Sequence, residues 1–206
     1  AFSLFKDYKM ALFFLFSMFL GAALQLTNMY GDTFLSDFEK NPLYKESSVV
    51  KYSTLIMSIS QISETLFILA IPFFLKKFGI KKVMLISMFA WVLRFLFFAY
   101  GTPEGFGLML IILSCVVYGM AFDFFNISGS LFVETTTDYK IRSSAQGLFM
   151  MMTNGFGAML GSLGSGWLIS QYFTHENGDK MWHEIWLAFS IYALIIAIAF
   201  AILFQH

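Results

Sequence analysis

The sequence predicts an all-α membrane protein with six transmembrane helices. Hydrophobic residues make up 58% of the 206 residues and charged residues only 13%, whereas soluble domains are about 45–50% apolar and about 25% charged. Six stretches are apolar over the roughly 20 residues that a helix needs to cross a bilayer core. Helices are predicted rather than strands because an open strand edge would leave backbone groups unsatisfied in lipid.

The predicted spans follow one another with short connections, and we expect them to pack as a single bundle over residues 1–206. No small-residue cleavage motif follows the first apolar run, so we expect that run to be a span rather than a signal peptide. The chain begins at Ala1 rather than Met, and we expect it to be a fragment of a longer protein. The spans cover residues 10–35, 49–75, 83–100, 106–133, 144–173 and 185–204.

The charges of the connections predict the orientation of the bundle. The connections at one end carry eight cations and those at the other end carry four. The positive-inside rule places the more basic end in the cytoplasm, so both termini are expected to be cytoplasmic in a multi-pass protein. The first set is Lys6, Lys9, Lys76, Lys77, Lys81, Lys82, Lys140 and Arg142, and the second is Lys40, Lys45, Lys51 and Lys180.

Carboxylates and amides lie inside the predicted spans, where they are costly. An ionised Asp near the bilayer centre costs about 2.5–3.5 kcal/mol on insertion scales unless it faces a cavity or a partner. Glu64 lies near the middle of the second span, three residues after Gln61 and therefore on the same helix face. Asp123 lies near the middle of the fourth span, and Gln25 and Asn28 are three residues apart in the first. These positions predict a central polar site.

Two aromatic residues accompany Asp123. Tyr118 and Phe122 are four residues apart and form a stripe beside the Asp123 face of the helix. Each polar or aromatic feature also has a structural interpretation, since amides often bond between helices and aromatic rings often only pack. The occurrence of polar pairs on three different helices favours a site.

Arg94 is a cation inside a predicted span, the third. We expect its side chain to extend along the helix toward the headgroups. The alternative is that it is a charge partner for one of the acidic residues.

The fifth span is rich in glycine, and Gly157 and Gly161 form a small-xxx-small pair. Such a pair predicts close helix packing. The alternative is a helix that bends as a transporter alternates its access.

The residue types argue against enzymes, metal sites and nucleic-acid binding. The single cysteine, Cys115, lies in an apolar run. The sequence shows neither a His, Cys and carboxylate cluster at ligand spacing nor a Gly-x-Ser-x-Gly motif, so we expect no metal and no catalytic site. The net charge is zero, which gives no indication of a nucleic-acid partner.

Residues 118–130, Tyr-Gly-Met-Ala-Phe-Asp-Phe-Phe-Asn-Ile-Ser-Gly-Ser, resemble the tenth helix of the nucleoside:proton symporter family of the major facilitator superfamily. Residues 25–28 and 61–64 resemble the seventh and eighth helices of that family, and the order and spacing agree along the chain. The basic Gly-containing segment 76–82 is either a positive-inside anchor or a degenerate copy of a loop that this superfamily carries in each half. The resemblance implies the C-terminal six-helix half of a major-facilitator transporter in a bacterial inner membrane.

The resemblance also implies a function and a site. The family imports nucleosides together with a proton by alternating access, and the N-terminal half of the same transporter would be the partner of this bundle. Amides would pair with the base edge, carboxylates would accept from the ribose, and aromatic rings would stack on the base. The implied pocket residues are Gln25, Asn28, Gln61, Glu64, Tyr118, Phe122 and Asp123.

We expect protons to be the coupling ion, and we expect no cofactor. A carboxyl in a low-dielectric pocket can bind and release a proton near neutral pH, so we assign proton coupling to Asp123 first and to Glu64 second. Two alternatives remain: a transporter half for another polar solute such as a sugar, and a membrane assembly subunit that transports nothing. In the latter, the polar residues would pair between helices without a cavity.

Overall fold

A computed structural model describes residues 2–204, so the start of the chain at Ala1 lies outside the described residues. Within this range the chain is helical, without a β-strand, and its only strand-like feature is an isolated bridge between Thr174 and Lys180. The predicted all-helical class is confirmed. In chain order the elements are η1 (Phe2–Lys6), α1 (Tyr8–Asp37), η2 (Phe38–Lys40), α2 (Ser48–Lys51), α3 (Ser53–Tyr100), α4 (Gly105–Thr136), α5 (Arg142–Met150), η3 (Met151–Gly157), α6 (Ala158–Tyr172) and α7 (Trp182–Leu203).

Four helical segments are long and apolar enough to cross a membrane, where the sequence predicts six spans. The difference has two causes, one in α3 and one in the glycine-rich helix. The four segments are Tyr8–Lys40, Ser53–Tyr100, Gly105–Thr136 and Trp182–Leu203.

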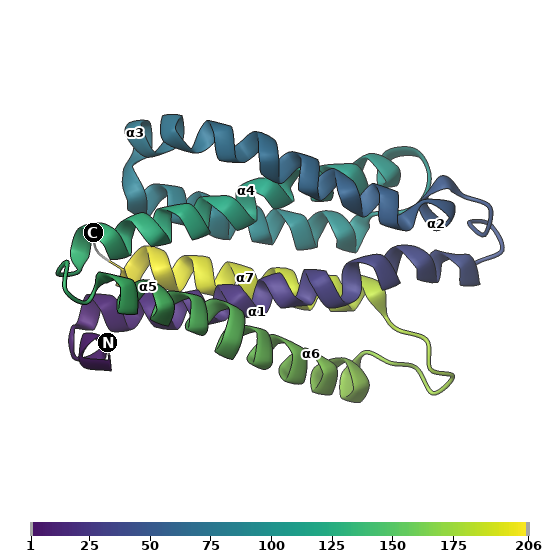
Figure 1. Ribbon diagram of the computed structural model, residues 1–206. Helices are drawn as coiled ribbons and strands as arrows, with labels where there is room; N and C mark the ends of the chain where they lie inside the picture. The colour runs from purple at the N-terminus through teal and green to yellow at the C-terminus, as the bar shows by residue number, and fades with distance from the viewer. Residues whose placement is uncertain (1, 205–206) are drawn as a thin grey trace.

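The helix α3 contains a reversal of the chain at Gly79. Its 48 residues would extend about 72 Å as a straight helix, more than twice the thickness of a bilayer core. Gly79 instead has φ 79° and ψ 169°, a conformation that glycine adopts without strain, and the ribbon turns back there (Figure 1). We call residues 53–78 the first arm and residues 80–100 the second arm of α3. The predicted connection at 76–82 is therefore wrong in length, since helix continues on both sides of a one-residue turn.

The fifth predicted span is divided into three elements that follow one another without a break. The middle element, η3, is a π-helix, and each piece is too short to count alone as a span. These elements pack tightly on α1: a Cβ at Gly21 would lie 2.0 Å from the carbonyl oxygen of Thr153, and one at Gly161 would lie 2.8 Å from that of Ala22. Glycine at these positions thus allows the close packing that the small-xxx-small pair predicts.

The core between α1, α3 and α7 is aromatic. Phe34, Phe95, Phe98 and Trp186 are buried, and the ring of Trp186 lies 5.0–5.8 Å from the other three ring centroids. In a bilayer such a core is stabilised by close packing, because lipid tails are as apolar as the side chains.

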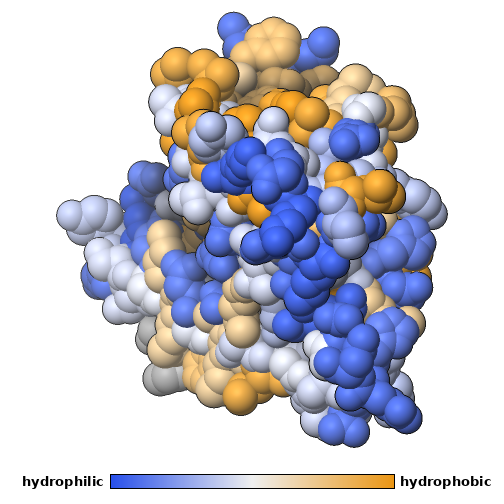
Figure 2. All heavy atoms as spheres, turned by 90° about the vertical axis from the view of Figure 1, so that its right-hand side faces the viewer, coloured by the Kyte–Doolittle hydropathy of each residue, from blue (hydrophilic) through white to orange (hydrophobic). Residues whose placement is uncertain are grey.

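The connections separate into two groups at opposite ends of the bundle (Figure 1). The Gly79 turn, the α4–α5 connection, the start of α1 and the end of α7 lie at one end. The connections α1–α3, α3–α4 and α6–α7 lie at the other end, which faces the viewer in Figure 2 and carries many hydrophilic side chains. This grouping agrees with the two sets of cationic connections in the sequence.

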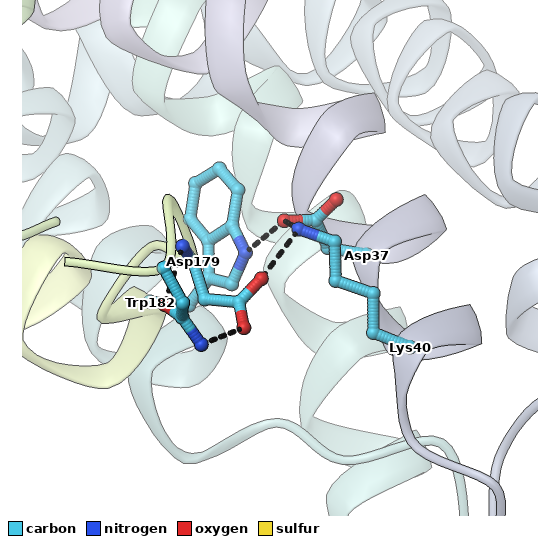
Figure 3. Close-up of polar contacts among 5 residues, drawn as sticks. Asp37, Lys40, Asp179 and Trp182 are labelled. Atoms are coloured by element: carbon cyan, nitrogen blue, oxygen red, sulfur yellow. Dashed lines mark hydrogen bonds and ion pairs between the residues drawn. The ribbon is translucent and has the colours of Figure 1, made fainter. Parts of the chain in front are cut away.

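A polar network closes this second end. Lys40 Nζ donates to Asp179 Oδ1 at 3.0 Å and to Asp37 Oδ2 at 3.3 Å, and Trp182 Nε1 donates to the same Asp37 oxygen at 3.0 Å. Figure 3 shows Lys40 between the two carboxylates. The network joins the end of α1 to the connection 173–181 and to the start of α7.

Replacing Lys40 with Met is expected to loosen the connection 173–181 with little change in melting temperature, because exposed ion pairs stabilise proteins weakly. The hydrogen bond from Lys40 lowers the pKa of Asp179 below 3.8, and Asp179 raises the pKa of Lys40 above 10.5. Asp179 therefore stabilises the folded connection fully above its usual pKa, and this stabilisation is lost as the pH falls through the lowered pKa. Lys40 stabilises it fully below its usual pKa, and this stabilisation is lost as the pH rises through the raised pKa. Hydrogen exchange of residues 173–181 in the unmodified chain should show constant protection from about pH 5 to about pH 9. K40M should exchange faster throughout this range, and equal protection in both proteins would contradict the role of the network.

Candidate functional site

A polar groove of about 220 Å³ lies where α1, both arms of α3 and α4 meet. Three of the predicted site residues line it: Asn28 and Gln61, which are exposed, and Tyr118, which is 6% exposed. The side chains in the groove are mostly short and polar, so it can bind hydroxyl and amide groups. The lining residues are Thr27, Asn28, Thr54, Met57, Ser58, Ser60, Gln61, Arg94 and Tyr118.

The aromatic stripe of α4 forms a wall rather than an open platform. The rings of Tyr118 and Phe122 are nearly parallel, at 5°, with centroids 5.9 Å apart, and Trp91 meets Tyr118 edge-on at 5.9 Å. Phe122 lines a separate small hollow of about 20 Å³, together with Trp91 and Asn126. Only a small part of Tyr118 therefore faces the groove.

The two carboxylates lie on neighbouring helices. Asp123 is 4% exposed, and its Oδ2 atom is buried without a hydrogen-bond partner among residues 2–204. Glu64, on the first arm of α3, is partly buried, and its backbone packs against α4 one helical turn from Asp123. The ionised forms of the two carboxylates would repel each other.

Gly119 allows this arrangement of the carboxylates. A Cβ on Gly119 would lie 2.5 Å from the carbonyl carbon of Ser63 and 2.6 Å from the backbone nitrogen of Glu64. The hydroxyl of Ser63 donates to the carbonyl oxygen of Val116 across the same contact. The backbones of α4 and the first arm thus touch beside Glu64, one helical turn before Asp123.

Gln25 lies apart from the groove. It is partly buried on α1, and its Cβ would be 3.1 Å from a Cβ on Gly161 of α6. The structure therefore brings Asn28, Gln61 and Tyr118 together in the groove. Glu64 and Asp123 lie on neighbouring helices. Gln25 lies at the flank, and Phe122 lines a separate hollow.

Both expectations for Arg94 are wrong. Its side chain is 0% exposed, so it does not extend to the headgroups, and within residues 2–204 no carboxylate lies within ion-pair distance of it. Arg94 lines the groove instead, although it is not among the site residues that the sequence predicts. The spacing in the sequence indicates that Arg94 is buried, because it shares one helix face with Trp91, Phe95 and Phe98. All four side chains are buried in the structure.

The described part of the chain contains no group of three or more His, Cys, Asp or Glu side chains that could hold a metal ion. Cys115 is buried with a free thiol. The groove thus offers amides, hydroxyls, the ring of Tyr118 and one guanidinium.

The chain is similar along its whole length to known proteins. The family model described as Nucleoside H+ symporter matches residues 1–206. The chain is 56% identical over its full length to the nucleoside permease NupG of Escherichia coli (strain K12) and 57% identical to the xanthosine permease of the same strain. It covers 49% of each of these proteins, so it spans about half the length of the curated relatives that it matches.

The fold agrees with solved structures. A crystal structure of the nucleoside transporter NupG matches the whole chain with a TM-score of 0.93, and a point mutant of NupG matches with 0.95, both at 56% identity. The matched region is 50% of each of those chains.

Proposed function

Because the chain belongs to the nucleoside:H+ symporter family, we propose that it is the C-terminal half of a proton-coupled nucleoside importer. The N-terminal half of the same transporter would be its partner, with the substrate between the two halves. The match to about half of each relative supports this arrangement, as do the nucleoside and xanthosine named for those relatives.

In this proposal six segments cross a bacterial inner membrane as one bundle. They are α1, the two arms of α3, α4, the run α5–η3–α6, and α7. Each arm of α3 is long enough for a core that needs about 20 helical residues, and the run over 142–172 is continuous helix. The basic end of the bundle, with both termini, would face the cytoplasm.

The groove beside the carboxylate pair carries the substrate proposal. Asn28 and Gln61 each offer an amide donor and an acceptor, which suit the edge of a nucleobase, and Gln25 would join them from the flank. The ribose hydroxyls would donate to Glu64 and Asp123. The wall of Tyr118, with Phe122 behind it, would border the flat base.

Proton coupling is proposed for Asp123, with Glu64 second. An ionised carboxylate with a buried, unpartnered oxygen is costly in an apolar surrounding, and a proton on that oxygen lowers the cost because it neutralises the charge. The repulsion between the two carboxylates acts in the same direction. Alternating exposure of Asp123 to the two sides of the membrane would then carry one proton across with each nucleoside.

Calorimetric titration of the full-length transporter with uridine and adenosine tests the proposed substrate class. We expect heat from at least one nucleoside, with a Kd between about 1 μM and about 1 mM, and none from glucose. Such affinities correspond to about 4–8 kcal/mol of binding free energy. Heat from glucose but from neither nucleoside would favour a sugar transporter, and no heat from any of the three would favour an assembly subunit.

A further inference from the structure

We infer that Arg94 is a positioning residue of the nucleoside groove, which acts on the site by holding the ring of Tyr118. This inference rests on the proposed function, because it assigns a role within the same groove. Arg94 belongs to the second arm of α3, its side chain is fully buried, and it lines the groove together with Tyr118.

Packing alone does not explain a cation at this position. A charged side chain inside a span is costly, and such residues usually mark functional sites. Arg94 forms no ion pair among the described residues that would compensate its charge. The cation is therefore better explained by the groups that it holds than by packing alone.

The guanidinium of Arg94 is fixed from two helices. Its Nε donates to Thr27 Oγ1 of α1 at 3.1 Å, and its Nη1 donates to the carbonyl oxygen of Ser114 in α4 at 2.7 Å. The hydroxyl of Ser114 donates in return to the carbonyl oxygen of Arg94 at 2.8 Å. The plane of the guanidinium is therefore set by α1 and α4, which both border the groove.

The fixed guanidinium in turn sets the ring of Tyr118. Its central carbon lies 4.7 Å from the centroid of that ring, a cation–π contact that strengthens when desolvated. Trp91 and Phe122 pack against the same ring at 5.9 Å each. Because only 6% of Tyr118 is exposed, a small rotation of the ring would change which of its atoms meet a ligand.

Two buried donors beside the groove have no partner among residues 2–204: Arg94 Nη2 and Ser60 Oγ. Both residues line the groove. An unsatisfied buried donor destabilises a fold, so this wall is arranged for something other than maximal stability. That agrees with a site that binds a polar ligand.

A double-mutant cycle on the full-length transporter tests the inference. Arg94→Met and Tyr118→Leu are made singly and together, and uridine binding is measured by calorimetry. We expect Arg94→Met to raise the Kd by roughly tenfold, or about 1.4 kcal/mol, because the ring of Tyr118 would no longer be held in the orientation that meets the ligand. In the Tyr118→Leu background the same change should alter the Kd by less than about twofold, because neighbouring residues that act together are not additive.

Arg142→Met is the matched control, since Arg142 also lies over a tyrosine, Tyr139, at 5.8 Å but outside the groove. Its Kd should stay within about twofold of the unmodified transporter. If Arg94→Met does not fold, the cycle is run with Arg94→Lys, which keeps the charge but loses the two-armed contact with Thr27 and Ser114.

The outcomes separate the two proposals. An unmodified transporter that binds no nucleoside would remove the proposed function. If the unmodified transporter binds uridine but the Arg94 substitution has equal effects with and without Tyr118, or no effect in either background, the positioning role is wrong and the proposed function stands.

Discussion

Replacing Asp123 with Asn is expected to abolish the accumulation of nucleoside that a pH gradient drives. Asparagine has the same shape but cannot bind and release a proton, so the buried position (4% exposed) would stay neutral in every state. A gradient of about one pH unit can sustain a concentration ratio of about ten when one proton accompanies each nucleoside. Uptake of labelled uridine into proteoliposomes should reach about that ratio with the unmodified transporter and about one with the variant.

Asp138→Asn is the control for this change. Asp138 is an exposed aspartate in the α4–α5 connection, where it accepts a hydrogen bond from the backbone of Lys140, and its replacement should leave accumulation unchanged. Glu64→Gln should lower accumulation less than Asp123→Asn does. If Asp123→Asn still accumulates uridine with the same pH dependence, Asp123 is not the coupling residue.

Replacing Gly119 with Ala is expected to weaken nucleoside binding by roughly tenfold and to lower the melting temperature. The new methyl group would lie 2.5–2.6 Å from backbone atoms of Ser63 and Glu64, which cannot rotate away as a side chain can. Overpacking of this kind typically costs about 1–3 kcal/mol. The first arm of α3 must move outward, which carries Gln61 and Glu64 away from the α4 residues of the site. Calorimetry with uridine and a thermal melt of the full-length transporter measure the two effects.

Gly164→Ala is the matched control for this prediction. A Cβ at Gly164 in α6 would meet nothing within 4 Å, and alanine favours a helix over glycine by up to about 1 kcal/mol. The control should melt at the same temperature or higher and bind uridine normally. Equal losses of melting temperature and uridine affinity in both variants would show that the backbone contact at Gly119 does not cause the effect.

Most of the fold was predictable because long apolar segments are a strong local signal. The ends of α1, α4 and α7 lie within about three residues of the predicted limits. The one-residue turn at Gly79 was not predictable in its length, since four lysines beside a glycine are equally typical of a longer loop. The π-helix over 151–157 places Thr153 against Gly21 of another helix, and that contact has no local signature in the sequence.

The site was predictable in part for a similar reason. Spacing along one helix identifies Asn28, Gln61 and Tyr118, which the structure brings into one groove. Spacing does not show how each helix is rotated in the bundle, so Gln25, placed with Asn28 in the sequence, lies toward α6 instead. The same limit applies to Arg94. Its depth in the membrane can be counted from the helix end, but the direction of its side chain depends on neighbours that are distant in the sequence.

Because of the turn at Gly79, the geometry of the site also depends on the number of residues in α3. A connection of one residue contains no slack, so the rotation of the second arm is tied to that of the first. One residue inserted beside Gly79 would turn the second arm by about 100° about its axis, and Arg94 would leave the groove while Gln61 stayed in it. Insertions that most connections between helices accept are therefore excluded here, and the two arms should move as one body whenever the bundle changes shape.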